Sequence, residues 1–129
     1  MQPGQSGKWG KLNVTEMLLH CNLSNKFILE GDAEYIKPGF KQRMIRSLVL
    51  YVLPRIPKNN PAPARTVTKG VQDIEFGQQK AVFIATIKKF PIRGRPFASI
   101  HPRMGYLSTK QWGKIAWMHM DHHLRQFGV

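Results

Sequence analysis

The chain has 129 residues, of which 42% are hydrophobic and 21% charged, a size and composition typical of one folded domain spanning residues 1–129. Its net charge of +13 raises the hypothesis of a nucleic-acid or other acidic partner, but the basic residues are scattered and form no single block. The one cysteine, Cys21, excludes an intramolecular disulfide framework and fits a reducing compartment, so we expect a cytoplasmic protein.

The first predicted helix begins after Asn13 and ends near Gly31. Asn13 followed by Glu16 is a variant of the capping box that opens many helices. The residues that follow have the three- and four-residue spacing of one helix face, which we expect to point inward. They are Met17, His20, Cys21, Ser24, Phe27 and Ile28.

A second helix is predicted for residues 40–53, since Pro54 cannot continue it. Its apolar residues again follow helical spacing, and we expect them to point inward. They are Phe40, Met44, Leu48, Tyr51 and Val52. Residues 54–70 contain four prolines and are predicted to form a loop within the domain.

A third helix is predicted for residues 71–89. Asp73 and Glu75 suit the positive end of its dipole, and Pro91 ends it. Its apolar stripe comprises Phe76, Phe83, Ile87 and Phe90. After a connection containing glycine and proline, a capping box at residues 108–111 opens the last helix, which continues almost to the end of the chain. The sequence therefore predicts an all-α fold.

Three of the five histidines lie in the stretch HMDHH near the end of the chain. His119 and His123 are four residues apart, so they lie within roughly 40° of each other on a mostly apolar helix face and could reach one ion. A pair of hydrogen-bonded or partly exposed histidines explains the spacing equally well. His122 and Asp121 point to other sides, and we expect them at the rim or in solvent. A zincin-type protease is excluded, because Met120 stands where that motif needs glutamate.

His20 is the candidate for a third ligand, because it lies on the face of the first helix that we expect to be buried. The alternative is an ordinary hydrogen-bonded core histidine. Three buried imidazoles without a carboxylate would suit zinc, nickel or another borderline divalent ion, with coordination positions left for water or substrate.

Several short motifs occur together in this chain. They are W-G-K at residues 9–11, M-L-L-H-C at 17–21, H-P at 101–102, W-G at 112–113 and H-M-D-H-H-L-R-Q-F-G at 119–128. Over nearly the whole chain they resemble a bacterial subfamily of the DinB-like (YfiT) superfamily of metal-binding four-helix bundles. The resemblance implies an up-down bundle with His20, His119 and His123 as ligands of zinc or nickel.

The same resemblance implies that one helix is missing. Members of the superfamily carry a further helix ahead of the W-G motif, so this chain resembles a bundle that lacks its first helix and keeps three long ones. The missing helix would leave an apolar groove, which leads us to expect a truncated chain or a homodimer.

Enzymatic members of that superfamily transfer low-molecular-weight thiols or catalyse a thiol-dependent isomerisation. The resemblance therefore implies a metal-dependent transferase or hydrolase that acts on a small-molecule substrate or thiol, through metal-bound water or thiolate. Gln126, one turn beyond His123, could orient that group or bond the backbone at the helix end. Arg125 could neutralise an anionic substrate, or it could be solvated.

Other readings stay open. A basic nucleic-acid-binding protein without catalysis, or a structural metal-binding bundle, would also fit parts of the sequence. His101 is expected either in a turn beside Pro102 or at the site, and Cys21 as a small buried hydrophobe. Trp112 and Trp117 are expected in the core or at an interface. The longest apolar runs, residues 48–53 and 81–87, are far shorter than the ~20 residues of a membrane span, so we expect no membrane partner.

Overall fold

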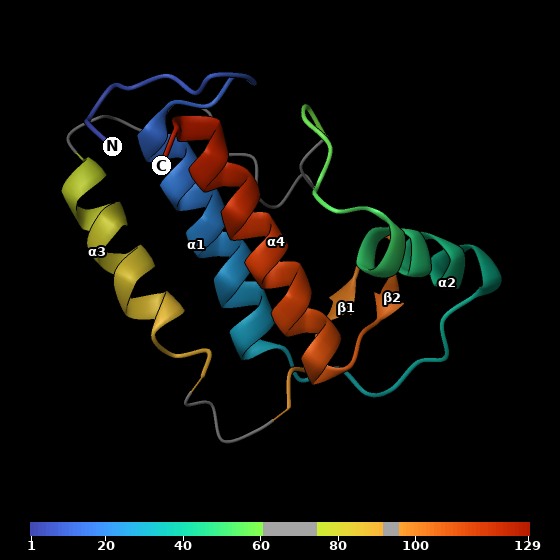
Figure 1. Cartoon of the computed structure of the whole chain (residues 1–129). Helices are drawn as coiled ribbons and strands as arrows, with labels where there is room; N and C mark the ends of the chain where they lie inside the picture. The colour runs from blue at the N-terminus through green and yellow to red at the C-terminus, as the bar shows by residue number, and fades with distance from the viewer. Residues whose placement is uncertain (61–74, 92–95) are drawn as a thin grey trace.

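The computed structural model describes residues 1–60, 75–91 and 96–129 (Figure 1). This part of the chain is mostly helical, with α1 (Val14–Glu30), α2 (Phe40–Ser47), α3 (Phe76–Ile87) and α4 (Thr109–Phe127). A short hairpin of β1 (Ile100–His101) and β2 (Gly105–Tyr106) completes it. The expectation of an all-α chain is confirmed in part, because the described residues are mostly helical but include this hairpin. A DinB-like four-helix bundle stays a prediction.

α1 and α4 begin where their capping boxes predict. The Asn13 side chain accepts a hydrogen bond from the backbone nitrogen of Glu16 at 2.9 Å, and Ser108 accepts one from that of Gln111 at 3.2 Å. α4 ends at Gly128, whose φ of 79° is the left-handed conformation of a helix C-terminus. The two helices lie side by side, and α3 packs against α1 (Figure 1).

α2 continues into a π-helical turn, η1 (Leu48–Val52), in which the backbone nitrogen of Leu53 donates to the Leu48 carbonyl at 2.9 Å. Together α2 and η1 match the predicted helix over residues 40–53. The predicted inward face is wrong, because the five residues expected to be buried there are all exposed, and Leu50 is buried in their place. The opposite side packs on the rest of the molecule: Arg46 donates to the Tyr106 carbonyl at 3.2 Å, and Ile45 and Val49 contact the core.

The described part of the third helix, α3, agrees with the predicted range and ends before Pro91. Its Phe76 and Phe83 are partly buried against α1. Residues 71–74 of the predicted helix, including Asp73, and residues 61–70 of the proline-rich loop lie outside the described residues.

The hairpin is an element that the sequence pattern does not predict. Ile100 pairs with Tyr106 and His101 with Gly105, and Gly105 has a φ of 71°. Two strands of two residues each are too short for the alternation of polar and apolar residues that marks a strand. The hairpin matters for the site because it places His101 opposite α4, where its ring lies 5.7 Å from that of Trp112.

The buried side chains form two clusters. One joins the end of α1 to η1, the hairpin region and the start of α4, with Ile28, Leu50, Met104, Leu107 and Trp112 among its members. The other joins the start of α1 to the end of α4 and contains Val14, Met17, Leu18, Cys21 and Phe127. None of the helices in the described ranges combines the length and apolar character needed to cross a membrane.

Residues 1–12 form a segment that covers the end of α4. The backbone nitrogen of Lys8 donates to the Gln126 carbonyl at 2.7 Å, and the Gln5 side chain donates to the Phe127 carbonyl at 3.1 Å. These bonds hold the W-G-K motif against the last turn of α4.

Candidate metal centre

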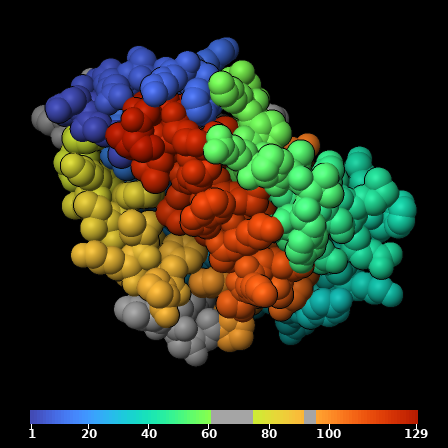
Figure 2. Space-filling model, in the orientation of Figure 1, coloured from blue at the N-terminus to red at the C-terminus, as the bar shows by residue number. Residues whose placement is uncertain are grey.

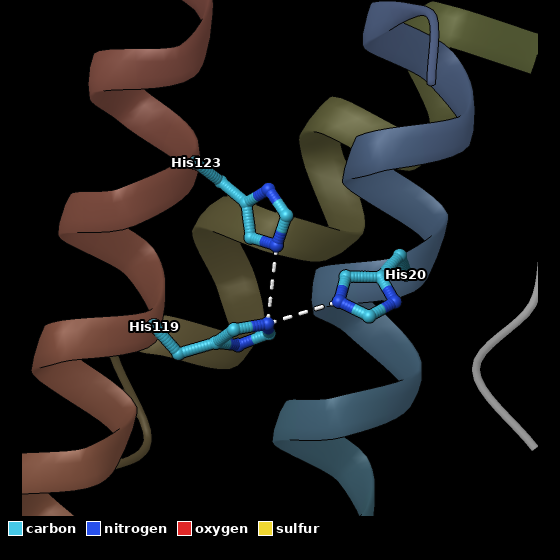
Figure 3. Close-up of side chains that lie close together, drawn as sticks. All are labelled: His20, His119 and His123. Carbon is cyan, nitrogen blue, oxygen red and sulfur yellow. Dashed lines mark hydrogen bonds between the residues drawn. The ribbon is translucent and has the colours of Figure 1, made fainter. Parts of the chain in front are cut away.

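The imidazoles of His20, His119 and His123 converge between α1 and α4 (Figure 3). The Nε2 atom of His119 lies 2.9 Å from that of His20 and 3.1 Å from that of His123. One ring nitrogen from each of the three lies within 4.8 Å of the others, so the group could hold a metal ion. The two histidines of α4 are thus brought together with the one from α1, as the sequence predicts.

The donor set fits a cation better than it fits hydrogen bonds. An imidazole nitrogen carries either one proton or one lone pair, both in the ring plane, so Nε2 of His119 cannot make good hydrogen bonds to His20 and His123 at once. Nitrogens bonded to one ion at about 2.1 Å lie roughly 3.0–3.4 Å apart, depending on the coordination angle. The observed separations of 2.9 and 3.1 Å are close to that range.

Burial keeps the rings of His119 and His123 neutral, which is the state in which imidazole binds metal. Desolvation lowers the pKa of His123 to about 4, even though its hydrogen bond to Gln126 acts in the opposite direction and raises it. Desolvation, together with the neighbouring His123 and His20, lowers the pKa of His119 well below its usual value. His119 keeps part of its surface accessible, whereas His20 and His123 are buried.

Gln126 fixes the tautomer of His123. Its Oε1 lies 2.8 Å from Nδ1 of His123, and its Nε2 donates to the Trp9 carbonyl at 2.7 Å. Because the amide NH2 is directed at a carbonyl, Oε1 must accept, so Nδ1 of His123 carries the proton and Nε2 carries the lone pair that faces the other imidazoles. Of the two roles considered for Gln126, bonding the backbone is observed, and its side chain also contacts His123.

The W-G motif leaves room for this amide. A Cβ atom at Gly10 would lie 2.6 Å from Nε2 of Gln126, and Gly10 has a φ of 80°. Only glycine fits both conditions without strain. The link between residues 9–10 and Gln126 is not predictable from the sequence, because nothing in the spacing of either motif reveals it.

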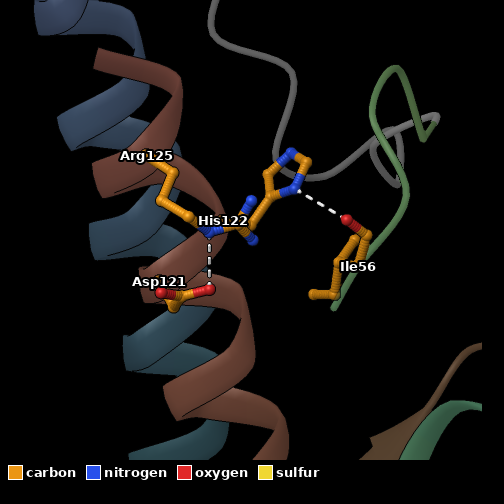
Figure 4. A network of polar contacts seen from close by, with 4 residues as sticks. All are labelled: Ile56, Asp121, His122 and Arg125. Carbon is orange, nitrogen blue, oxygen red and sulfur yellow. Dashed lines mark hydrogen bonds and ion pairs between the residues drawn. The ribbon is translucent and has the colours of Figure 1, made fainter. Parts of the chain in front are cut away.

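The expectation that His122 lies at the rim or in solvent is wrong, since this side chain is buried. Its Nδ1 is 3.3 Å from the Ile56 carbonyl (Figure 4). The centre of its ring lies 6.0 Å from that of the Trp9 ring. Desolvation lowers its pKa, and the Ile56 carbonyl partly offsets this. His122 does lie on a different side of α4 from His119 and His123, but the loop after η1 and the segment around Trp9 cover that side of the helix.

Asp121 and Arg125 are partly exposed, and they form an ion pair of 2.8 Å between Nε of Arg125 and Oδ2 of Asp121 (Figure 4). This pair joins two successive turns of α4. Cys21 is buried, as expected of a small hydrophobe, and desolvation raises the pKa of its thiol to about 12.

The three imidazoles open into a cavity of about 730 Å³ that all five histidines of the chain line. Most other lining side chains are apolar, and they come from α1, η1 with its flanks, the hairpin and α4. They include Phe27, Ile45, Leu48, Val49, Met104, Trp112 and Ile115. The charged side chains among the described lining residues are those of Lys11 and Arg103, both basic.

His101 stabilises a turn and also lines the cavity, so both of the placements expected for it are observed. Its Nδ1 accepts hydrogen bonds from the backbone nitrogens of Arg103 and Met104, each 3.1 Å long, which is a turn role beside Pro102. Its side chain also lines the cavity. Trp112 is buried in the core and donates to the Ser99 carbonyl at 3.0 Å, whereas Trp117 is exposed.

Comparison with known proteins gives a family and no function. Neither the curated proteins nor the solved structures contain a match to this chain. A family model described as "Protein of unknown function (DUF1569)" matches residues 1–128. The chain therefore belongs to the DUF1569 family.

Proposed function

We propose that this chain is a DinB-like metal-dependent protein in which His20, His119 and His123 hold one zinc or nickel ion. The proposed activity is that of a transferase or hydrolase acting on a small molecule with the help of a thiol. The observation that carries the proposal is the convergence of three Nε2 atoms, with separations of 2.9 and 3.1 Å, inside a cavity large enough for a substrate. A cytoplasmic location belongs to the same proposal and rests on the free, buried thiol of Cys21.

A divalent ion held there would lower the pKa of a thiol or water molecule and so supply a nucleophile at neutral pH. The chain itself contributes neutral imidazoles, because burial lowers the pKa of His119 and His123. Gln126 holds His123 in the tautomer that presents Nε2. The apolar lining favours a substrate with an apolar body and limits access of bulk water, and Lys11 and Arg103 suit an anionic group on it.

Metal analysis of protein purified without added metal tests the site. We expect about one zinc or nickel ion per chain, and loss of that ion in His20→Ala and His119→Ala. The matched control is His101→Asn, which lines the same cavity outside the three ligands, and whose amide oxygen can still accept the turn hydrogen bonds. Metal-free wild-type protein with normal helical content would contradict the proposal, as would equal loss of metal in the control.

A second measurement separates an enzyme from a structural metal protein. Metal-loaded chain is incubated with several low-molecular-weight thiols and apolar electrophiles, and with apolar esters, and turnover is compared with that of His20→Ala. Turnover that depends on His20 supports the proposal. A metal-loaded chain that is inactive throughout favours the structural alternative, and strong retention on DNA or RNA that falls steeply with salt favours the nucleic-acid alternative.

A further inference from the structure

The segment from residue 35 to residue 52 carries most of the exposed large apolar side chains of the described chain. Seven of the eleven are found here: Tyr35, Ile36, Phe40, Met44, Leu48, Tyr51 and Val52. The exposed fraction is 73% for Phe40, 69% for Tyr51 and 68% for Val52, so most of the surface of these residues faces solvent. A concentration of this kind on one element marks an interaction surface.

Four of these side chains form a ridge along α2 and η1. Phe40, Met44, Leu48 and Tyr51 follow the four- and three-residue spacing of a single helix face along α2 and η1. The opposite side of the same helix packs against the hydrophobic core through Leu50, Ile45 and Val49. The ridge therefore faces away from the core, and in Figure 2 the segment forms the right-hand edge of the visible surface.

Basic residues flank the ridge. Lys41 and Arg43 are exposed on its two sides, and Lys37 precedes it. Nζ of Lys114 lies 5.3 Å from the centre of the Tyr51 ring, so α4 adds a further cation beside the ridge. Residues 35–52 include no aspartate or glutamate. An occupant of this surface therefore meets apolar and positively charged groups together.

The combination of exposed apolar side chains and flanking basic residues favours one kind of binding partner for the ridge over another. A second copy of the chain would supply the apolar contact but would bring Lys41 and Arg43 close to the same basic residues of its partner. An anionic bilayer surface offers acyl chains for the ridge and phosphates for its flanks, and tyrosines such as Tyr35 and Tyr51 suit the headgroup level. We propose that α2 and η1 dock the protein peripherally on anionic membranes, with the ridge inserted among the lipids and Lys41 and Arg43 against the phosphates.

The ridge also adjoins the cavity. Leu48 is exposed on the ridge and lines the cavity, and its neighbours Ile45 and Val49 line it too. Docking through this face therefore places the cavity beside the lipid surface. The expectation of no membrane partner rested on the lengths of apolar runs, which bear on spanning a bilayer and not on lying against one.

Vesicle binding of the full chain tests the proposal. Vesicles of phosphatidylcholine with an equal amount of phosphatidylglycerol are compared with pure phosphatidylcholine, and bound protein is measured by flotation. We expect binding to the anionic vesicles only, weakening as salt is raised. Replacement of Phe40 and Met44 by serine is expected to lower the affinity at least tenfold, since it removes the centre of the ridge.

The matched control replaces Val82 and Ile84 of α3, which are 43% and 41% exposed, by serine, and is expected to bind as the wild type does. A second pair tests charge: Lys41→Ala should weaken binding about fivefold, a factor of the size expected for one cation near an anionic surface, while Lys80→Ala on α3 should not. Helical content is checked for each variant by circular dichroism, and metal content does not enter the readout.

Two results would overturn the proposal. One is absence of binding to the anionic vesicles, or binding that the ridge variant does not weaken. The other is a stable dimer in analytical ultracentrifugation that Phe40→Ser dissociates and that fails to bind vesicles, which would make the ridge an interface between copies of the chain.

Discussion

Gln126 connects three parts of the chain through one amide. Its oxygen accepts a hydrogen bond from Nδ1 of His123, its nitrogen donates one to the carbonyl of Trp9, and Gly10 leaves the space that the amide occupies. Such a partner fixes both the ring orientation and the tautomer of a ligand histidine. The amide is therefore a positioning residue for the proposed metal site, without any contact to substrate being needed.

Gln126→Leu tests this role, because leucine has a similar size but cannot accept the hydrogen bond from Nδ1 of His123. We expect the dissociation constant for zinc to rise about 10- to 100-fold, while one ion per chain still binds at saturation. Affinity is measured by competition with a chromophoric chelator. The same substitution at the exposed Gln78 of α3 serves as the control. An unchanged constant in Gln126→Leu would show that His123 does not depend on the amide.

At the scale of the elements, helix starts were predictable and helix faces only in part. The capping boxes at Asn13 and Ser108 are local, so they can be read from four residues. The buried face of α2 depends on which side meets α4 and the hairpin, and both of its sides carry apolar residues. Periodicity therefore predicted the helix at residues 40–53 correctly but assigned the wrong face of it to the core.

The end of α1 depends on a close approach that the sequence does not reveal. A Cβ atom at Gly31 would lie 1.7 Å from Oγ of Ser99, and that hydroxyl donates to the Phe27 carbonyl at 2.5 Å. Ser99 cannot turn away without losing this bond. Gly31 thus allows the segment around Ser99, just before β1, to pack against the end of α1.

Two alanine substitutions of glycine are expected to have opposite effects. Gly31→Ala should lower the free energy of unfolding by about 1–3 kcal/mol, because the methyl group overpacks a contact that cannot relax. Gly113→Ala lies inside α4, and apart from the adjacent residues and the backbone of its own helix no atom lies within 4 Å of the new methyl group. This substitution should raise the free energy of unfolding by up to about 1 kcal/mol. Urea denaturation of both variants measures the effects. Equal effects, or a neutral Gly31→Ala, would contradict the packing at Ser99.

At the scale of the whole molecule, the three imidazoles were predictable and their surroundings were not. His119 and His123 share a helix face by spacing alone, and His20 lies on the inward face of another helix. The cover over His122 and the cavity wall come from the loop after η1, the hairpin and the first 12 residues. Their placement depends on contacts across the whole chain, such as Lys8 with Gln126, that no local pattern encodes.

These buried rings make the stability of the metal-free protein depend on pH. The pKa of His123 is about 4 in the folded chain against 6.5 for the ordinary side chain, so the unfolded chain binds more protons between these values. Stability is therefore lost as pH falls below 6.5, and the loss is complete below about 4. From pH 7 to pH 5, His123 alone should cost about 2 kcal/mol, and His119, whose pKa is also lowered, adds to it.

Urea denaturation in the presence of a chelator at pH 7, 6 and 5 measures this effect. His123→Gln cannot take up a proton and should show a weaker dependence on pH, whereas His101→Asn should keep the wild-type dependence. Added zinc should raise stability most at pH 7 and least at pH 5, since protons and metal compete for the same nitrogens. Stability that is constant between pH 7 and pH 5 would mean that the rings are open to water and already protonate freely in the folded chain.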